Sequence, residues 1–196
     1  MIFLNFKIYQ ETSGDNTIKL CRLIKDKRVV PCLQAIDIYR VKQALPDLEI
    51  WGQYADPVGL AAASGVLLNH SEHQLSFDQI KATVVKCRES KLRVMIITDT
   101  LELIKKVNQL KPDYIGFEDP KLIGGPVAMI DAHFGLVKQA AAATQGPLIV
   151  GGGIRTGEHV TKSLKAGGQG VLVASEFAKS NNPEKTLQEL LKGLDT

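Results

Sequence analysis

The feature that most restricts the fold is an alternation of short apolar runs with amphipathic segments, which continues along the whole chain. Short apolar runs bounded by turn residues are typical of strands, and the segments between them show the spacing of helices. The predicted strands are residues 2–6, 29–33, 49–54, 66–69, 93–98, 114–118, 148–151 and 169–173. The predicted helices are residues 17–25, 36–44, 77–90, 100–110, 128–144, 157–166 and 183–191. This order indicates βα units around a parallel sheet.

One crossover lacks a predicted helix. The segment DPVGLAAASG, between the third and fourth strands, is too short for a normal crossover helix, although an extended stretch can return along a strand. An open doubly wound sheet would fit the same alternation. Polar and glycine residues, however, follow the first, fourth, sixth, seventh and eighth strands, and a closed barrel would gather them on one face. We therefore predict an α/β fold, a single (β/α)8 or TIM barrel over residues 1–196, with the third helix missing or reduced.

Composition excludes several classes of protein. The 24 basic and 21 acidic side chains nearly balance and form no block of like charge, so we expect no nucleic-acid partner. No apolar run reaches the roughly 18 to 20 residues of a membrane span, and the start lacks a signal peptide, so we expect a soluble, cytoplasmic protein. Cys21, Cys32 and Cys87 lie in unrelated contexts, which favours small core residues over a metal site.

Three strand ends carry ionisable groups. Asn5 and Lys7 share one side of the first strand, where Lys7 is either a fixed charge for an anionic substrate or a surface lysine. His70 follows the fourth strand and is either an acid or electrophile near neutral pH or a loop histidine with capping neighbours. Glu118 ends the sixth strand. The segment after it, residues 119–126, has prolines and glycines near its ends and is either a lid or a simple turn.

The last two strands end in small residues. Residues 151–153 are all glycine, and Ala174 and Ser175 follow the eighth strand. Glycines let backbone N–H groups approach an anion, and phosphate sites of such barrels lie after strands seven and eight. The spacing does not match GxGxxG, which argues against a dinucleotide. We predict a phosphate site here.

Read together, these motifs resemble the triosephosphate isomerase family, in particular its compact archaeal-type branch. The matching pieces, spread over nearly the whole chain, are NFKIY, QYADPV, LLNHSEH, the strand-six glutamate with LIGG, VGGGI with RTGEHV, and GVLVAS. The glycine runs alone would also fit other phosphate-binding barrels. The N-terminal lysine, NHSE and the strand-six glutamate make the resemblance specific.

The resemblance implies an isomerase that interconverts dihydroxyacetone phosphate and glyceraldehyde 3-phosphate in glycolysis and gluconeogenesis, with no cofactor and no metal. Glu118 would be the base and His70 the neutral electrophile. Lys7 would stabilise the enediolate, and Asn5 would hold Lys7 and the substrate oxygen. The implied supporting carboxylate and phosphate-binding residues are Glu72, Gly124, Gly153, Ala174 and Ser175.

Two departures from the family bear on activity. Asp119 stands where the family has proline, and a carboxylate so close to Glu118 would raise its pKa. The short third crossover would remove the loop that normally packs into a neighbouring subunit, so we expect a monomer or an oligomer of another kind. Inward packing of Trp51, Tyr54 and residues 60–63 would be an alternative support. Two other functions therefore stay open: a weak or inactive sugar-phosphate-binding relative, and another phosphate-binding barrel enzyme.

Overall fold

The computed structural model describes residues 1–55 and 62–195 and contains a closed barrel of parallel strands. The strands are β1 (Ile2–Asn5), β2 (Val29–Leu33), β3 (Trp51–Gly52), β4 (Gly65–Leu68), β5 (Arg93–Thr98), β6 (Tyr114–Phe117), β7 (Leu148–Val150) and β8 (Gly170–Val173). The barrel closes at Ile2, which aligns with Val29 of β2 on one side and with Val171 of β8 on the other. The predicted (β/α)8 barrel is confirmed, although the third strand is shorter than predicted.

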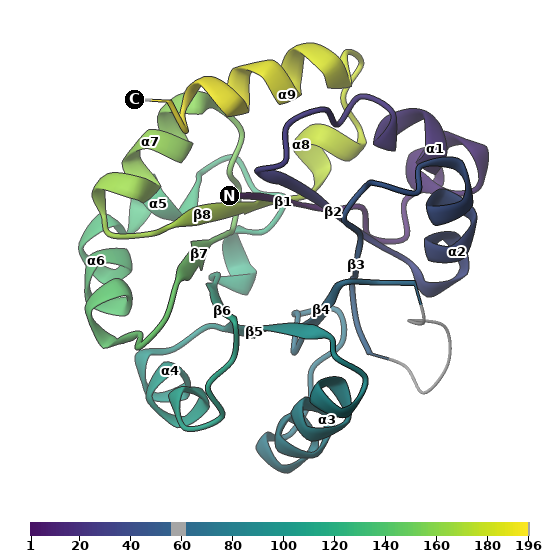
Figure 1. Ribbon diagram of the computed structural model, residues 1–196. Coiled ribbons are helices and arrows are strands. Elements are labelled where there is room, and N and C mark those ends of the chain that lie inside the picture. Colours follow the sequence, from purple (N-terminus) through teal and green to yellow (C-terminus); the bar gives the residue numbers. More distant parts are fainter. Residues whose placement is uncertain (56–61, 196) are drawn as a thin grey trace.

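Helices surround the strands as a ring (Figure 1). They are α1 (Asp15–Cys21), α2 (Ala35–Ala44), α3 (Phe77–Glu89), α4 (Leu101–Asn108), α5 (Met129–Ala132), α6 (Phe134–Ala143), α7 (Gly157–Lys165), α8 (Ser175–Ala178) and α9 (Pro183–Lys192), with 3-10 turns η1 (Gln10–Thr12) and η2 (Pro120–Leu122). No helix in the described part of the chain is long and apolar enough to span a membrane.

One predicted helix is interrupted in the structure, and the crossover predicted to lack a helix is described only in part. A continuous helix over residues 128–144 is wrong, because the backbone of His133, with φ −136° and ψ 40°, leaves the helical region and separates α5 from α6. Between β3 and β4, residues 53–55 and 62–64 form no helix, and the rest of that crossover, residues 56–61, lies outside the described residues.

Side-chain caps fix where several helices begin after the strands. Ser76 and Gln79 form a reciprocal capping box at α3, in which each side chain accepts the backbone N–H of the other. Thr100, Thr156 and Asn182 each accept the N–H three residues on, at the starts of α4, α7 and α9. These caps define the loops that connect each strand's carboxyl end to its helix.

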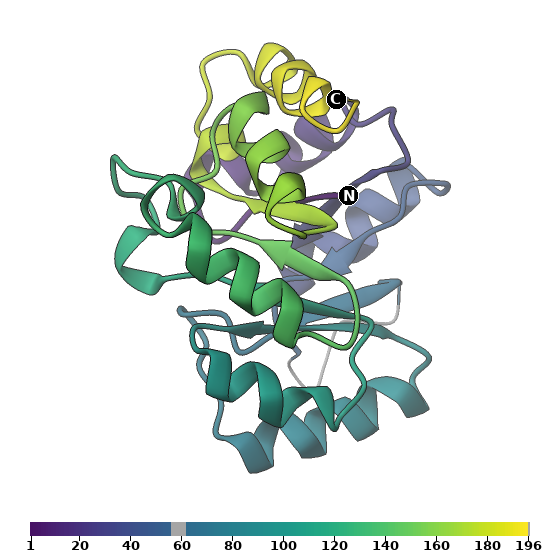
Figure 2. The same cartoon turned by 90° about the vertical axis from the view of Figure 1, so that its left-hand side faces the viewer.

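The core has two layers, as expected for strands that are buried on both faces. One cluster fills the barrel interior, where the Phe3 ring meets Trp51 and Tyr114 edge-on at 5.1 and 5.2 Å. Gly65 leaves room for the indole, because a Cβ there would overlap it. The larger cluster lies between strands and helices, and Figure 2 displays α6 and α7 side by side in this outer layer. All three cysteines are free and buried, so their prediction as core residues is confirmed.

Candidate active site

A cavity of about 100 Å³ at the carboxyl ends of the strands brings most of the predicted site residues together. Those lining it are Asn5, Lys7, His70, Glu118, Gly124, Gly153, Ala174 and Ser175. Glu72 does not line the cavity but contacts Lys7. The barrel thus places side chains and loops from its first, fourth, sixth, seventh and eighth strands around one space.

Lys7 is a buried cation at the end of β1. Its side chain is 4% exposed, so the surface-lysine alternative is wrong. Its backbone has a positive φ of 51°, and its N–H donates to Asn5 Oδ1 at 3.1 Å, which holds the turn after the strand. The ammonium lies 3.1 Å from Glu72 Oε1, and Glu72 is half exposed. A buried ammonium with a single carboxylate partner provides a fixed positive charge at the cavity wall.

His70 presents an N–H to the cavity. Its Nδ1 accepts the backbone N–H of Glu72 at 3.3 Å, so the proton of the neutral ring lies on Nε2. Burial lowers the pKa of His70 to about 4; Lys7 also lowers it, whereas Glu72 opposes the change. The ring is therefore neutral at pH 7. Asn69, with φ 63°, holds the loop that contains His70 by donating to Ile97 O and accepting from Leu75 N–H, both at 2.9 Å.

Glu118 faces this histidine from the end of β6. Its Oε2 lies 3.5 Å from His70 Nε2 and has no hydrogen-bond partner. Burial raises the pKa of Glu118 to about 7, while Lys7 and the N–H of Gly152 lower it and Glu72 raises it. The carboxylate is closely packed, because a Cβ at Gly151 would overlap it. A carboxyl group is suited to general base catalysis when its pKa is near neutrality and one of its oxygens has no hydrogen-bond partner.

Asp119 does not act on Glu118 as predicted. The pKa of Glu118 is raised, but burial is the main cause and Glu72 is the acidic neighbour that contributes. Asp119 instead caps η2, since its Oδ1 accepts the N–H of Lys121 at 2.9 Å. Its Oδ2 lies 3.9 Å from His133 Nε2. Local capping therefore directs this carboxylate to its own turn.

The opposite side of the cavity is rich in glycine and other small residues. Gly124, Gly152 and Gly153 have φ of 72°, 84° and 76°, a region that side chains rarely adopt. A Cβ at Gly153 would come within 2.9 Å of Val127 O, so glycine is required for this close packing. Ala174 and Ser175 line the same space at the start of α8. Loops of this kind, with glycines in a left-handed conformation, are a common means by which protein backbones hold phosphate.

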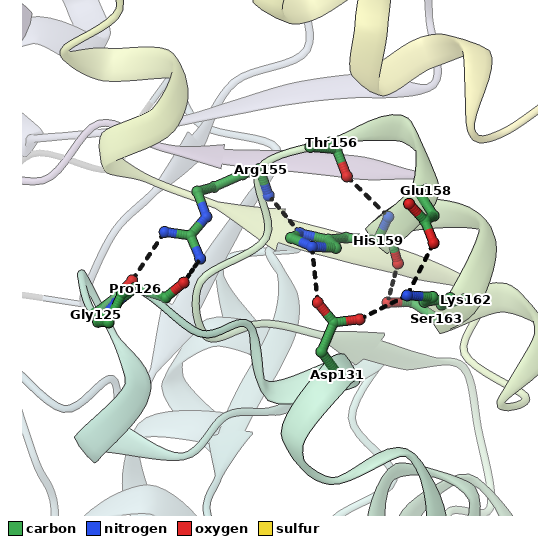
Figure 3. A network of polar contacts seen from close by, with 9 residues as sticks. All are labelled: Gly125, Pro126, Asp131, Arg155, Thr156, Glu158, His159, Lys162 and Ser163. Atoms are coloured by element: carbon green, nitrogen blue, oxygen red, sulfur yellow. Dashed lines mark hydrogen bonds and ion pairs between the residues drawn. The ribbon is translucent and has the colours of Figure 1, made fainter.

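Sequence reasoning missed three polar or charged side chains of the cavity lining: Tyr9, Arg155 and Glu176. Arg155 had a signal, because it is a cation two residues after the glycine run. Figure 3 places its guanidinium against the carbonyls of Gly125 and Pro126. Within residues 1–55 and 62–195, no group of three or more His, Cys, Asp or Glu side chains could hold a metal ion.

Most of the described residues named as an alternative support pack inward, and their support of Lys7 and His70 stays a prediction. Trp51 packs inside the barrel against Phe3 and Tyr114. Tyr54 stacks on His73 with ring centroids 5.2 Å apart, and Ala62 and Ala63 pack against the outer core. Residues 60 and 61 lie outside the described part of the chain.

Comparison with known proteins finds full-length relatives. A triosephosphate isomerase of Saccharolobus solfataricus is 33% identical, over 97% of this chain and 94% of that protein. A triosephosphate isomerase of Methanosarcina acetivorans is 32% identical, over 97% of each chain. Among solved structures, a 3-hexulose-6-phosphate synthase covers 98% of each chain with a TM-score of 0.77 and 16% identity, a likeness in fold.

A family model described as "Histidine biosynthesis protein" also matches, over residues 76–193. This region runs from α3 to α9 and contains the glycine loops after β7, but it excludes Asn5, Lys7 and His70. The two relatives, unlike this model, extend over the N-terminal strands as well. On these full-length relatives, the chain belongs to the triosephosphate isomerase family of (β/α)8 barrels.

Proposed function

We propose that the protein is an intramolecular oxidoreductase that interconverts dihydroxyacetone phosphate and glyceraldehyde 3-phosphate, as a step of glycolysis and gluconeogenesis. One observation carries the proposal: the unpartnered Oε2 of Glu118 lies 3.5 Å from His70 Nε2, at the wall that also holds the buried ammonium of Lys7. A base, a neutral hydrogen-bond donor and a cation are the groups that proton transfer next to a carbonyl requires. The names of the full-length relatives support the same reaction.

The proposed reaction uses these three side chains in turn. Glu118 takes a proton from the hydroxymethyl carbon of dihydroxyacetone phosphate, and the C–H electrons form the carbon–carbon double bond of an enediolate. His70 Nε2–H donates to the developing oxyanion and moves a proton between the two oxygens, while Lys7 stabilises the negative charge. Glu118 then returns its proton to the neighbouring carbon. The steps balance without a cofactor or a metal.

The phosphate group would be held on the opposite side of the cavity. Gly124, Gly153, Ala174 and Ser175 line that side, and their N–H groups would attract a dianion without adding titratable groups. This division keeps the tightly bound phosphate away from the reacting carbons. Asn5 would steady Lys7 and reach the substrate oxygen.

Another phosphate-binding barrel enzyme is the second candidate. The histidine biosynthesis model over residues 76–193 favours it, because that region includes Glu118 and the glycine loops. A second substrate would need a larger cavity than about 100 Å³, since drug-sized ligands occupy roughly 300 Å³ or more. The isomerase proposal needs no second substrate.

Assembly and location follow as part of the proposal. The alignment with the Saccharolobus relative extends over 215 residues, more than the 196 of this chain, so the relative has residues without a counterpart here. We place part of that difference in the third crossover and expect a monomer, or an oligomer built on another face, in the cytoplasm. Lower activity than the family norm would follow if a partner's loop normally steadies Lys7 and His70.

Light scattering at two protein concentrations measures the assembly. A stable dimer that contacts through the third crossover would contradict the proposed assembly.

A coupled assay tests the reaction. Dihydroxyacetone phosphate formed from glyceraldehyde 3-phosphate is reduced by an added dehydrogenase, and loss of NADH is followed by absorbance. We expect saturable turnover that inorganic phosphate inhibits competitively. Phosphate binding without turnover would point to a sugar-phosphate-binding relative. Absence of both would contradict the proposal.

A further inference from the structure

The side chain of Arg155 joins two loops that bring different backbone groups to the cavity. It belongs to the loop between β7 and α7, and its Nη1 donates to Gly125 O at 3.0 Å while its Nη2 donates to Pro126 O (Figure 3). Both acceptors belong to the segment after Glu118, which also contributes Gly124 to the cavity. A guanidinium that donates to two adjacent carbonyls fixes direction as well as distance, because its donors form a rigid planar fork.

The backbone of Arg155 is held from behind by α5 and α7. Its N–H donates to His159 Nδ1 at 3.1 Å, which leaves the ring proton on Nε2, 3.0 Å from Asp131 Oδ2. Lys162 lies 2.9 Å from the other oxygen of Asp131, and the pKa of Asp131 is lowered mainly by this hydrogen bond. Asp131 lies on α5, directly after the segment that Arg155 holds. The backbone of Arg155 is therefore held in place by α5 and α7, and its guanidinium extends from this fixed position.

Close packing near the Arg155 guanidinium leaves little room for the two loops to move relative to each other. The N–H of Met129 donates to Gly152 O at 2.8 Å, and a Cβ at Gly153 would come within 2.9 Å of Val127 O. Further toward β6, Leu122 and Gly125 donate only within the segment, to Asp119 O and Leu122 O. Arg155 thus anchors the part of residues 119–126 that follows Gly124. The earlier part of this segment is held by hydrogen bonds between its own backbone groups.

We propose that Arg155 is a positioning residue whose fork sets Gly124 and Gly153 at the separation needed for both to bind one phosphate. The inference deepens the proposed function, because it concerns the phosphate end of the same site. Fork geometry matters here and charge alone is insufficient: lysine would keep the charge but could not bridge two carbonyls in a fixed plane. The consequence is a role in substrate affinity, with less effect on the proton transfer at Glu118.

Arg155→Lys, Arg155→Ala and a matched control test this inference. Arg88 is the control, since its Nη2 also donates to two adjacent carbonyls, Leu110 O and Lys111 O, outside the cavity lining. Amide hydrogen exchange of peptides covering residues 121–128 is measured by mass spectrometry, and the Kd of inorganic phosphate by calorimetry. Steady-state kinetics then separate KM from kcat.

For both Arg155 variants, we expect exchange in residues 121–128 and the phosphate Kd to rise about tenfold, the loss of roughly one good charged hydrogen bond. KM should rise by a similar factor and kcat should change less. Arg88→Lys should leave exchange of that segment and the phosphate Kd within about twofold of the wild type.

Three results would overturn the inference. A wild-type phosphate Kd in Arg155→Lys would mean that charge suffices. Faster exchange without weaker phosphate binding would make Arg155 a purely structural anchor, and no change in Arg155→Ala would make it an ordinary surface residue. Lack of isomerase turnover in the wild type would defeat the proposed function alone, because exchange and phosphate binding are read without the reaction.

Discussion

The two sides of the cavity solve different problems with different chemistry. On the side of β1, β4 and β6, the lining carries ionisable side chains, with Lys7, His70 and Glu118 all nearly inaccessible to water. On the side of β7 and β8, the lining is mostly backbone, with Gly152 and Gly153 in a left-handed conformation. In the proposed function, the first side would change protonation and requires buried charge, whereas the second would offer backbone dipoles and requires glycines in a left-handed conformation.

This difference predicts separable effects of substitution. Changes on the side-chain half should lower the rate while leaving phosphate affinity nearly intact, because binding uses other groups. Changes on the backbone half should lower affinity more than the rate constant of proton transfer. A substitution that lowers the reaction rate and the phosphate affinity equally would contradict this division.

The largest effect is expected for Glu118→Gln. Removing the base should lower kcat by on the order of a thousandfold or more, while the phosphate Kd stays within a few-fold. Steady-state kinetics and calorimetry measure the two quantities. Glu89→Gln, at the exposed end of α3, is the control and should behave as the wild type. Loss of binding as large as the loss of rate would make Glu118 a structural residue.

A smaller loss is expected for His70→Gln. Glutamine can still donate a hydrogen bond but cannot move protons between the two oxygens, so kcat should fall on the order of a hundredfold. His133→Gln, a change of the same kind outside the cavity lining, provides the comparison. Near-normal turnover in the His70 variant would remove this histidine from the mechanism.

The backbone half is tested by Gly153→Ala. A Cβ at φ 76° is strained and would press on Val127 O, so the phosphate Kd should rise by about tenfold or more. Gly135→Ala is the control, because a Cβ there meets nothing within 4 Å and the residue lies in α6. Phosphate titrations compare the two after circular dichroism confirms folding. Equal affinity in both variants would argue against phosphate binding at the β7 loop.

The smallest effect concerns stability and pH. The pKa of Glu118 rises from 4.5 to about 7 on folding, so its contribution to stability is present below pH 4.5 and is lost as pH rises through 7. Glu118→Gln should therefore be more stable than the wild type at pH 8, by on the order of 1–2 kcal/mol since glutamine remains a buried polar group, with little gain at pH 4.5.

Urea denaturation at these two pH values measures that gain. The pKa of His70 falls to about 4 on folding and so has the opposite sign, because it makes stability rise with pH between about 4 and 6.5. The effects of the two pKa shifts on the pH dependence of stability partly cancel in the wild type. In the His70→Gln variant, the loss of stability with rising pH that is due to Glu118 should therefore be larger. Equal stability of Glu118→Gln and the wild type at pH 8 would contradict the claim that burial of the ionised Glu118 carboxylate lowers stability.

Sequence reasoning found the barrel and the side-chain half well for a physical reason. Strand periodicity places Asn5, Lys7 and Glu118 at strand ends, and a closed parallel barrel brings all such ends together. Burial of Lys7 could not be inferred, because one strand does not reveal what covers its end. The pKa of Glu118 was expected to depend on Asp119, but charge proximity in sequence differs from proximity in space once Asp119 caps its own turn.

The backbone half was less accessible. Glycine runs indicate where the chain turns closely, yet they do not reveal which carbonyl lies opposite or which side chain bridges the loops. The contacts of Arg155 with Gly125 and Pro126 span about thirty residues and depend on the packing of α5 against α7. The break at His133 was missed because apolar spacing continues across it, from α5 into α6.

Proton exchange with solvent tests most directly whether Glu118 is the base that attacks the carbon next to the carbonyl. Dihydroxyacetone phosphate is incubated in D₂O with the wild type or Glu118→Gln, and proton NMR follows the signal of its hydroxymethyl carbon. The wild type should incorporate deuterium there and form glyceraldehyde 3-phosphate, whereas Glu118→Gln should do neither while still binding inorganic phosphate. No deuterium incorporation by the wild type, or equal incorporation by the variant, would contradict this assignment.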